Sequence, residues 1–92
     1  MMSKYKISDS IALRDIMGES VLVPIKEIEG FNGIYALNPT SRIIYDCIAE
    51  GKETDDAVNA ILKEYDADRQ DVERDVKECI DDMERKKIIY KV

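Results

Sequence analysis

The junction at Asn38-Pro39 constrains the fold of this chain more than any other feature of its sequence. A short run of strand-forming residues, Ile34–Leu37, precedes the junction, and an amphipathic helical pattern follows it as far as Gly51. Asn38 is a favoured helix N-cap, and a proline at the first helical position gives up no hydrogen bond that the helix would make. Gly51 suits the left-handed position just past a helix end. The junction therefore predicts strands before it and helices after it.

The residues before the junction predict a small antiparallel sheet. The turn signals are Met17–Ser20, centred on Gly18, and the loop Lys26–Gly33, whose Asn32-Gly33 pair is typical of a hairpin. Pro24 cannot donate to a ladder and predicts a bulge or an unpaired position. A three-stranded meander of this size is stable only if helices cover one of its faces. The expected strands are Ile11–Ile16, Val21–Ile25 and Ile34–Leu37, with a possible short one at Tyr5–Ile7.

Three helices are expected after the junction. The first runs over about Pro39–Glu50, the second begins with Thr54 as its N-cap, and the third runs over about Arg69–Lys86. The tail Ile88–Val92 is expected as a closing strand or as an extended segment on the body. The predicted class is α+β, winged-helix-like, with a three-stranded antiparallel sheet followed by three helices. The expected apolar faces of the helices are Ile43, Ile44, Cys47 and Ile48; Ala57, Val58, Ile61, Leu62 and Tyr65; and Val72, Val76, Cys79, Ile80 and Met83.

The composition narrows the classes of function. Ninety-two residues suit one domain, and the net charge of −6 opposes general binding to nucleic acid or to an anionic membrane. No apolar run approaches the ~20 residues of a membrane span, and no signal-peptide pattern opens the chain, so a cytoplasmic location is expected. The sequence contains no His, which removes the commonest general base and metal ligand. The many carboxylates fall at helix starts and on solvent faces, and Cys47 and Cys79 are expected as buried reduced thiols. An enzyme is therefore disfavoured.

Winged-helix proteins often bind duplex DNA, and a DNA-binding transcriptional regulator is the alternative function. The segment 68–87, which would supply the recognition helix, carries eight acidic and six basic residues. Phosphate attraction supplies most of the non-specific affinity for DNA, so this helix is unfavourable for it. A third possibility is a small enzyme subunit that is inactive alone.

Peptide binding is the remaining class of function. An open three-stranded sheet has an edge with unpaired N–H and C=O groups. Such an edge accepts an extended peptide as an added strand. Ile34–Leu37 leads directly into the helices, so a groove between this strand and a helix is geometrically natural. The alternative is that the tail Ile88–Val92 covers the edge, and the pattern leaves both interpretations open.

The chain resembles PqqD-like proteins, which include the pyrroloquinoline quinone (PQQ) biosynthesis protein D and the precursor-peptide recognition domains of ribosomally made, modified peptides. The resemblance covers about Ile11–Ile89. It implies a non-catalytic module without a cofactor that captures the leader segment of a precursor peptide by β-strand addition. It also implies that the module presents this peptide to a maturase, commonly a radical S-adenosylmethionine enzyme. The segments that carry the resemblance are Ile11–Ile16, Val21–Val23, Ile34–Thr40, Ile48–Thr54 and the last helix.

The resemblance also implies which residues bind the peptide. The guest strand would pair with the strand Gly33, Ile34, Tyr35, Ala36 and Leu37. The apolar wall on the last helix would be Val72, Val76 and Cys79, and Arg69 and Arg74 would be available to acidic residues of a leader. Leu37, Ile44 and Ile48 are also expected in the core. Neither the identity of the peptide nor that of the maturase follows from the sequence.

Overall fold

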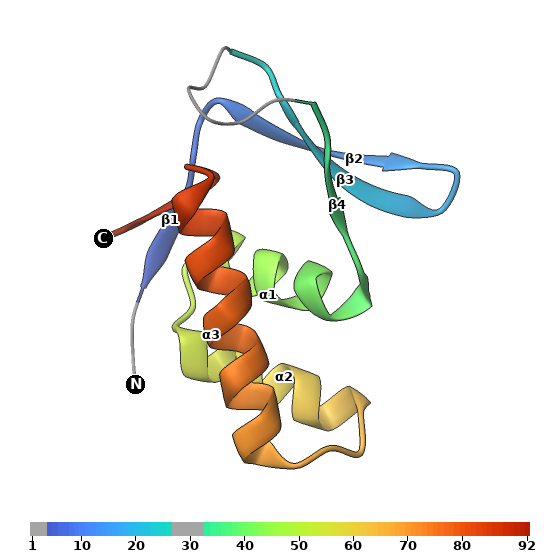
Figure 1. Ribbon diagram of the computed structural model, residues 1–92, viewed down its shortest axis with the longest axis vertical. Coiled ribbons are helices and arrows are strands. Elements are labelled where there is room, and N and C mark those ends of the chain that lie inside the picture. Colours follow the sequence, from blue (N-terminus) through green and yellow to red (C-terminus); the bar gives the residue numbers. More distant parts are fainter. Residues whose placement is uncertain (1–3, 27–32) are drawn as a thin grey trace.

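The computed structural model describes residues 4–26 and 33–92 of the chain (Figure 1). The sheet lies at one end of the molecule and the helices lie below it. The elements are β1 (Tyr5–Ile7), β2 (Ile11–Ile16), β3 (Glu19–Pro24), β4 (Tyr35–Leu37), α1 (Pro39–Ala49), α2 (Thr54–Glu64), α3 (Arg69–Arg85) and β5 (Ile89–Lys91). This arrangement confirms the predicted α+β class with a three-stranded antiparallel sheet and three helices.

The three-stranded sheet has the order β2-β3-β4, and both of its pairings are antiparallel, as the predicted meander requires. The predicted turn Met17–Ser20 is too long, because Glu19 and Ser20 already belong to β3 and pair with β2. Met17 and Gly18 alone form the turn, with φ of 52° and 84°. Two positive φ values in a two-residue loop match the twist of a tight hairpin, so the strands pair up to the loop itself.

The end of β3 differs slightly from the prediction. Pro24 is its last residue and pairs with Ile11, so it ends the strand and does not interrupt it. The backbone N–H of Ile25 then donates to the carbonyl of Ser10 at 2.8 Å. The predicted hairpin signal at Asn32 lies outside the described residues, whereas Gly33 is described and has a φ of 84°.

The start of α1 follows the prediction made from the junction. The side chain of Asn38 accepts a hydrogen bond from the backbone N–H of Ser41 at 2.8 Å, and Pro39 is the first helical residue. Gly51 follows the helix with a φ of 78°, which suits a residue without a Cβ atom. Local chemistry therefore fixes both ends of α1.

The prediction of Thr54 as the N-cap of α2 is wrong. Thr54 is the first helical residue, and Glu53 is the N-cap. Glu53 and Asp56 form a reciprocal capping box, in which the carboxylate of Asp56 accepts from the backbone N–H of Glu53 at 2.9 Å. The predicted apolar stripe also ends early, because Tyr65 lies past the helix end and is 44% exposed.

The two ends of the chain form a separate two-stranded ribbon. β5 pairs antiparallel with β1, from Ile7 opposite Ile89 to Tyr5 opposite Lys91. Beyond the strands, the backbone N–H of Ser8 donates to the carbonyl of Ile88 at 2.8 Å. The closing strand that the tail predicted is therefore present, and its partner is β1, outside the three-stranded sheet.

The core lies between the sheet, the ribbon and the three helices. Leu22, Met83, Ile88 and Ile89 are each at most 1% exposed. Leu37, Ile44 and Ile48 are buried in the same cluster, as expected. No described helix has both the length and the apolar composition that crossing a membrane requires.

Candidate functional site

The outer edge of β4 is open in the described part of the chain. β4 is the last strand in the order β2-β3-β4, and β3 is the only strand with which it pairs there. The chain's own closing strand does not cover this edge, because β5 pairs with β1. Of the two interpretations that the sequence left open, the structure therefore favours the uncovered edge. Its N–H and C=O groups are available for pairing with an added strand.

A groove of about 820 Å³ runs between this edge and α3. Tyr35 and Ala36 line it from β4, and Ile44 and Ile61 line it from α1 and α2. In the view of Figure 1, α1 lies between β4 and α3, and α2 lies below α1. From α3 the groove is lined by Val72, Asp75, Glu78, Cys79 and Asp82. The groove thus has a strand edge along one wall and a helix along the other.

A hydrogen bond ties the two walls together. The hydroxyl of Tyr35 donates to Oδ2 of Asp82 at 2.7 Å, across 47 positions of the chain. The bond, together with the guanidinium of Arg85, holds the pKa of the Asp82 carboxyl below its ordinary value, although partial burial opposes this shift. Burial, and then the bond to Asp82, raise the pKa of Tyr35 above its ordinary value of 10.0. The pair is therefore a neutral phenol bound to a charged carboxylate.

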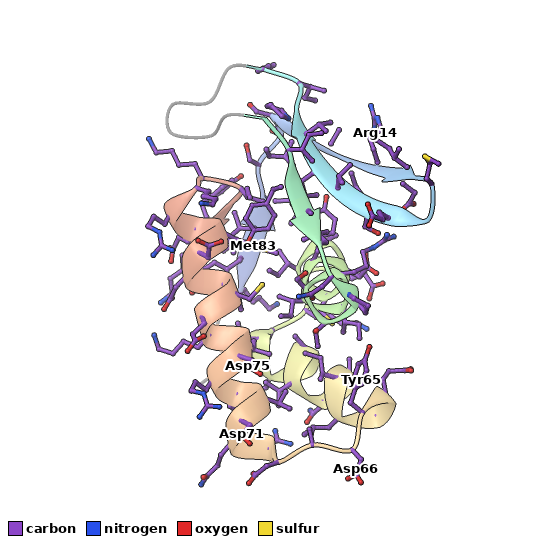
Figure 2. The ribbon with its side chains drawn as sticks, turned by 45° about the vertical axis from the view of Figure 1, so that its right-hand side comes forward. Arg14, Tyr65, Asp66, Asp71, Asp75 and Met83 are labelled. Carbon is purple, nitrogen blue, oxygen red and sulfur yellow. The ribbon has the colours of Figure 1, made fainter. Side chains whose placement is uncertain are left out.

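Two stripes of α3 face different surroundings. One stripe is buried in the core and consists of Val72, Val76, Ile80 and Met83. The second stripe lines the groove and consists of Val72, Asp75, Cys79 and Asp82, at spacings of three, four and three residues. Figure 2 shows Asp75 on the flank of α3 that is turned toward α1 and α2. The helix therefore completes the core and forms one wall of the groove at the same time.

The structure brings only some of the predicted binding residues to the groove. Tyr35, Ala36, Val72 and Cys79 line it. The other three residues of the predicted strand, Gly33, Ile34 and Leu37, are not among its lining residues. Gly33 and Ile34 precede β4 and are exposed, and Leu37 is buried in the core.

The remaining predicted residues on α3 lie elsewhere. Val76 is buried in the core, on the side of the helix that faces a different hollow, next to Tyr5. Arg69 pairs with Glu73 at 3.3 Å, and Arg74 pairs with Asp71 at 3.1 Å. Neither arginine lines the groove. The acidic groove residues Asp75, Glu78 and Asp82 were missed, although their spacing beside Val72 and Cys79 is visible in the sequence.

Cys79 differs from the expected buried thiol, because it is only half-buried and lines the groove, whereas Cys47 is buried. Burial, and then the charge of Asp82, raise the pKa of Cys79 to about 11. The thiol is therefore protonated at neutral pH and contributes a small apolar surface to the groove. Within residues 4–26 and 33–92, no group of three His, Cys, Asp or Glu side chains is placed to hold a metal ion.

The sequence itself matches a known family. Residues 19–89 match the family model described as Coenzyme PQQ synthesis protein D (PqqD). The chain belongs to the PqqD family. The match spans β3 to β5 and so includes both walls of the groove. None of the curated proteins matches the chain.

Two solved structures resemble this PqqD-family chain over most of its length. The structure "TbiB1 in Complex with the TbiA(beta) Leader Peptide" shares 30% sequence identity, with a TM-score of 0.77 over 91% of this chain and 93% of the other. "Lasso peptide synthetase B1 complexed with the leader peptide" shares 18% identity, with a TM-score of 0.82 over 96% and 99% of the two chains. The second similarity is one of fold alone. Both of these proteins are described in complex with a leader peptide.

Proposed function

We propose that this PqqD-family chain is a non-catalytic module that captures the leader segment of a ribosomally made precursor peptide. The leader would add to β4 as an extra strand and lie in the groove against α3. The observation that carries the proposal is the open edge of β4 beside this groove, with the chain's own β5 paired elsewhere. Main-chain hydrogen bonds would supply affinity, and the groove would select side chains. The complex of TbiB1, which is 30% identical to this chain, with a leader peptide supports a leader peptide as the ligand.

The proposal extends to the partner and the location of the module. The bound precursor would be presented to a maturase, for which a radical S-adenosylmethionine enzyme is the proposed class, in the cytoplasm. A test is to search the genes beside this chain's gene for a radical S-adenosylmethionine enzyme and a short precursor peptide, and then to co-purify the chain with that enzyme in the presence and absence of that peptide. A complex that forms with the peptide supports the presenting role, and three components that elute separately count against it.

Strand addition is tested best by altering the backbone of the guest. A proline in β4 would disturb its pairing with β3 as well as the open edge, so the variant would be ambiguous. The probe is instead a binder selected from a display library of random twelve-residue peptides on the full chain. Its amides are then N-methylated one at a time, and binding is measured by fluorescence anisotropy. Because alternate amides of a strand point to the same side, binding should be lost at every second position. Equal tolerance of N-methylation at all positions would overturn strand addition.

A variant pair tests the position of the groove. Cys79→Trp places a large side chain between the walls and should weaken binding of the selected peptide at least tenfold. Glu84→Trp makes the same addition at an exposed position of α3 that does not line the groove, and should leave binding unchanged. Circular dichroism checks that both variants are folded. Equal affinity of the two variants would show that the peptide binds elsewhere.

A further inference from the structure

The charges that line the groove all have one sign. Its charged lining residues are Asp75, Glu78 and Asp82 from α3, and no Lys or Arg is among the described residues that line it. The resemblance implied the opposite arrangement, with Arg69 and Arg74 facing acidic residues of a leader. Both arginines are instead held by acidic neighbours on α3 and do not line the groove.

The acids on the rest of α3 are mostly neutralised by cations of the same helix. Lys77 pairs with Asp81 at 3.0 Å, in the same manner as Arg69 with Glu73 and Arg74 with Asp71. Within the groove, Asp82 is also compensated, because Arg85 donates to it at 2.6 Å. The unbalanced charge of the groove therefore lies at the level of Asp75 and Glu78.

Asp75 and Glu78 have no ion-pair or hydrogen-bond partner in the described part of the chain. They lie three residues apart on α3, so they occupy one side of the helix, about 4.5 Å apart along its axis. Both are exposed when the groove is empty. A strand that lies against this wall would bring its side chains within reach of two carboxylates that repel each other and any acidic guest.

We propose that the captured segment carries a lysine or arginine that faces Asp75 and Glu78, next to an apolar residue on the same side of the strand. This inference rests on the proposed function and names the chemistry of its substrate. The spacing of Asp75 and Cys79 on α3 supports a basic and an apolar residue two positions apart in the guest strand. Asp75 and Cys79 are about 6 Å apart along the helix, and side chains on one face of a strand repeat every ~6.8 Å. A cation opposite Asp75 therefore places the residue two positions away opposite the apolar surface of Cys79.

Electrostatic matching of this kind gives selectivity more than total affinity. Partly exposed ion pairs contribute little individually, so removal of both carboxylates should weaken binding by roughly fivefold at low salt. The effect should shrink as the salt concentration rises, because the pair is partly accessible to solvent. The main-chain bonds to β4 are independent of these charges.

The test uses peptides selected on the full chain from the random twelve-residue library. The selected sequences should be enriched in a basic residue two positions from an apolar one. In the best binder, Lys→Gln should weaken binding to the chain roughly fivefold, and Lys→Glu should weaken it further. The protein variant Asp75→Asn/Glu78→Gln should lose the preference for Lys over Gln. The matched control is Asp71→Asn/Glu73→Gln, which removes two charges from α3 outside the groove and should keep the preference.

The outcomes separate this inference from the proposed function. Binders without basic enrichment, or equal affinity for the Lys, Gln and Glu peptides, would overturn the charge preference and leave strand addition in place. A preference for Lys that persists in Asp75→Asn/Glu78→Gln would also overturn it, because the charge would then act from another surface. A library that yields no binder, or a binder unaffected by Cys79→Trp, would count against the proposed function itself.

Discussion

Tyr35 and Asp82 meet across the groove, with the phenolic hydroxyl 2.7 Å from a carboxylate oxygen. Tyr35 belongs to the edge strand β4 and Asp82 to the last turns of α3. Their bond joins the strand and the helix at this level of the groove. It also fixes the ring of Tyr35 as part of the wall, beside the open edge of the sheet.

Loss of this bond should destabilise the domain without unfolding it. Tyr35→Phe keeps the ring and removes the hydroxyl, and we expect the free energy of unfolding to fall by about 1 kcal/mol. Urea denaturation followed by circular dichroism measures the change. Tyr90→Phe is the matched control, because Tyr90 is 49% exposed, and its effect should be close to zero. Equal stabilities of Tyr35→Phe and the unmodified protein would show that the bond contributes nothing in solution.

The bond between Tyr35 and Asp82 should contribute less to the free energy of unfolding at both acid and alkaline pH. The pKa of Asp82 is lowered by folding, so its stabilising contribution is present above pH 4 and is lost as the pH falls through the folded-state pKa. The pKa of Tyr35 is raised by folding, so its contribution is present below pH 10 and is lost as the pH rises further. The difference in unfolding free energy between the protein and Tyr35→Phe should be largest between about pH 5 and 9. A difference that stays constant from pH 2 to 11 would contradict the assignment.

The thiol of Cys79 should react slowly despite its position in the groove. With a pKa of about 11, roughly one thiol in a thousand is ionised at pH 8. We expect alkylation of Cys79 by iodoacetamide to be about a hundredfold slower in the folded protein than in urea. Peptide mapping by mass spectrometry distinguishes Cys79 from Cys47. Modification of Cys79 at the same rate in both conditions would show that the thiol is neither shielded nor perturbed.

The N-cap of α1 is a local contribution to stability that can be tested separately. Asn38→Ala removes the acceptor for the backbone N–H of Ser41 and should lower the free energy of unfolding by about 1 kcal/mol. Asn38→Asp keeps an oxygen at the same place and should restore most of the loss. Thermal or urea unfolding of the two variants measures the difference. If Asn38→Asp has the same free energy of unfolding as Asn38→Ala, the loss of stability comes from other contacts of Asn38.

Most elements of the fold follow from short stretches of sequence. The Asn38-Pro39 start of α1 and the apolar periodicity of α3 identify their elements because the chemistry acts within a few residues. The sequence predicts element boundaries less well, as the capping box of Glu53 and Asp56 shows. A Thr and a Glu are both possible at the start of α2, and the choice depends on which side chain reaches the free N–H groups.

The groove was only partly predictable for a related reason. Each residue of α3 can be assigned to a face from its spacing, but the spacing does not say which neighbour covers each face. Val76 and Cys79 both fit one apolar arc, yet Val76 is buried in the core and Cys79 lines the groove. The acids beside Cys79 appear as an ordinary solvated surface until β4 is placed opposite them.

Local sequence specifies the order of strands and helices, the ends of α1, and the charge balance that argues against nucleic acid. These features depend on interactions between residues that are close along the chain. The packing of distant segments, by contrast, pairs β5 with β1, leaves the edge of β4 open and brings Tyr35 to Asp82. Pairing between distant segments depends on how the whole core packs, and no local preference specifies it.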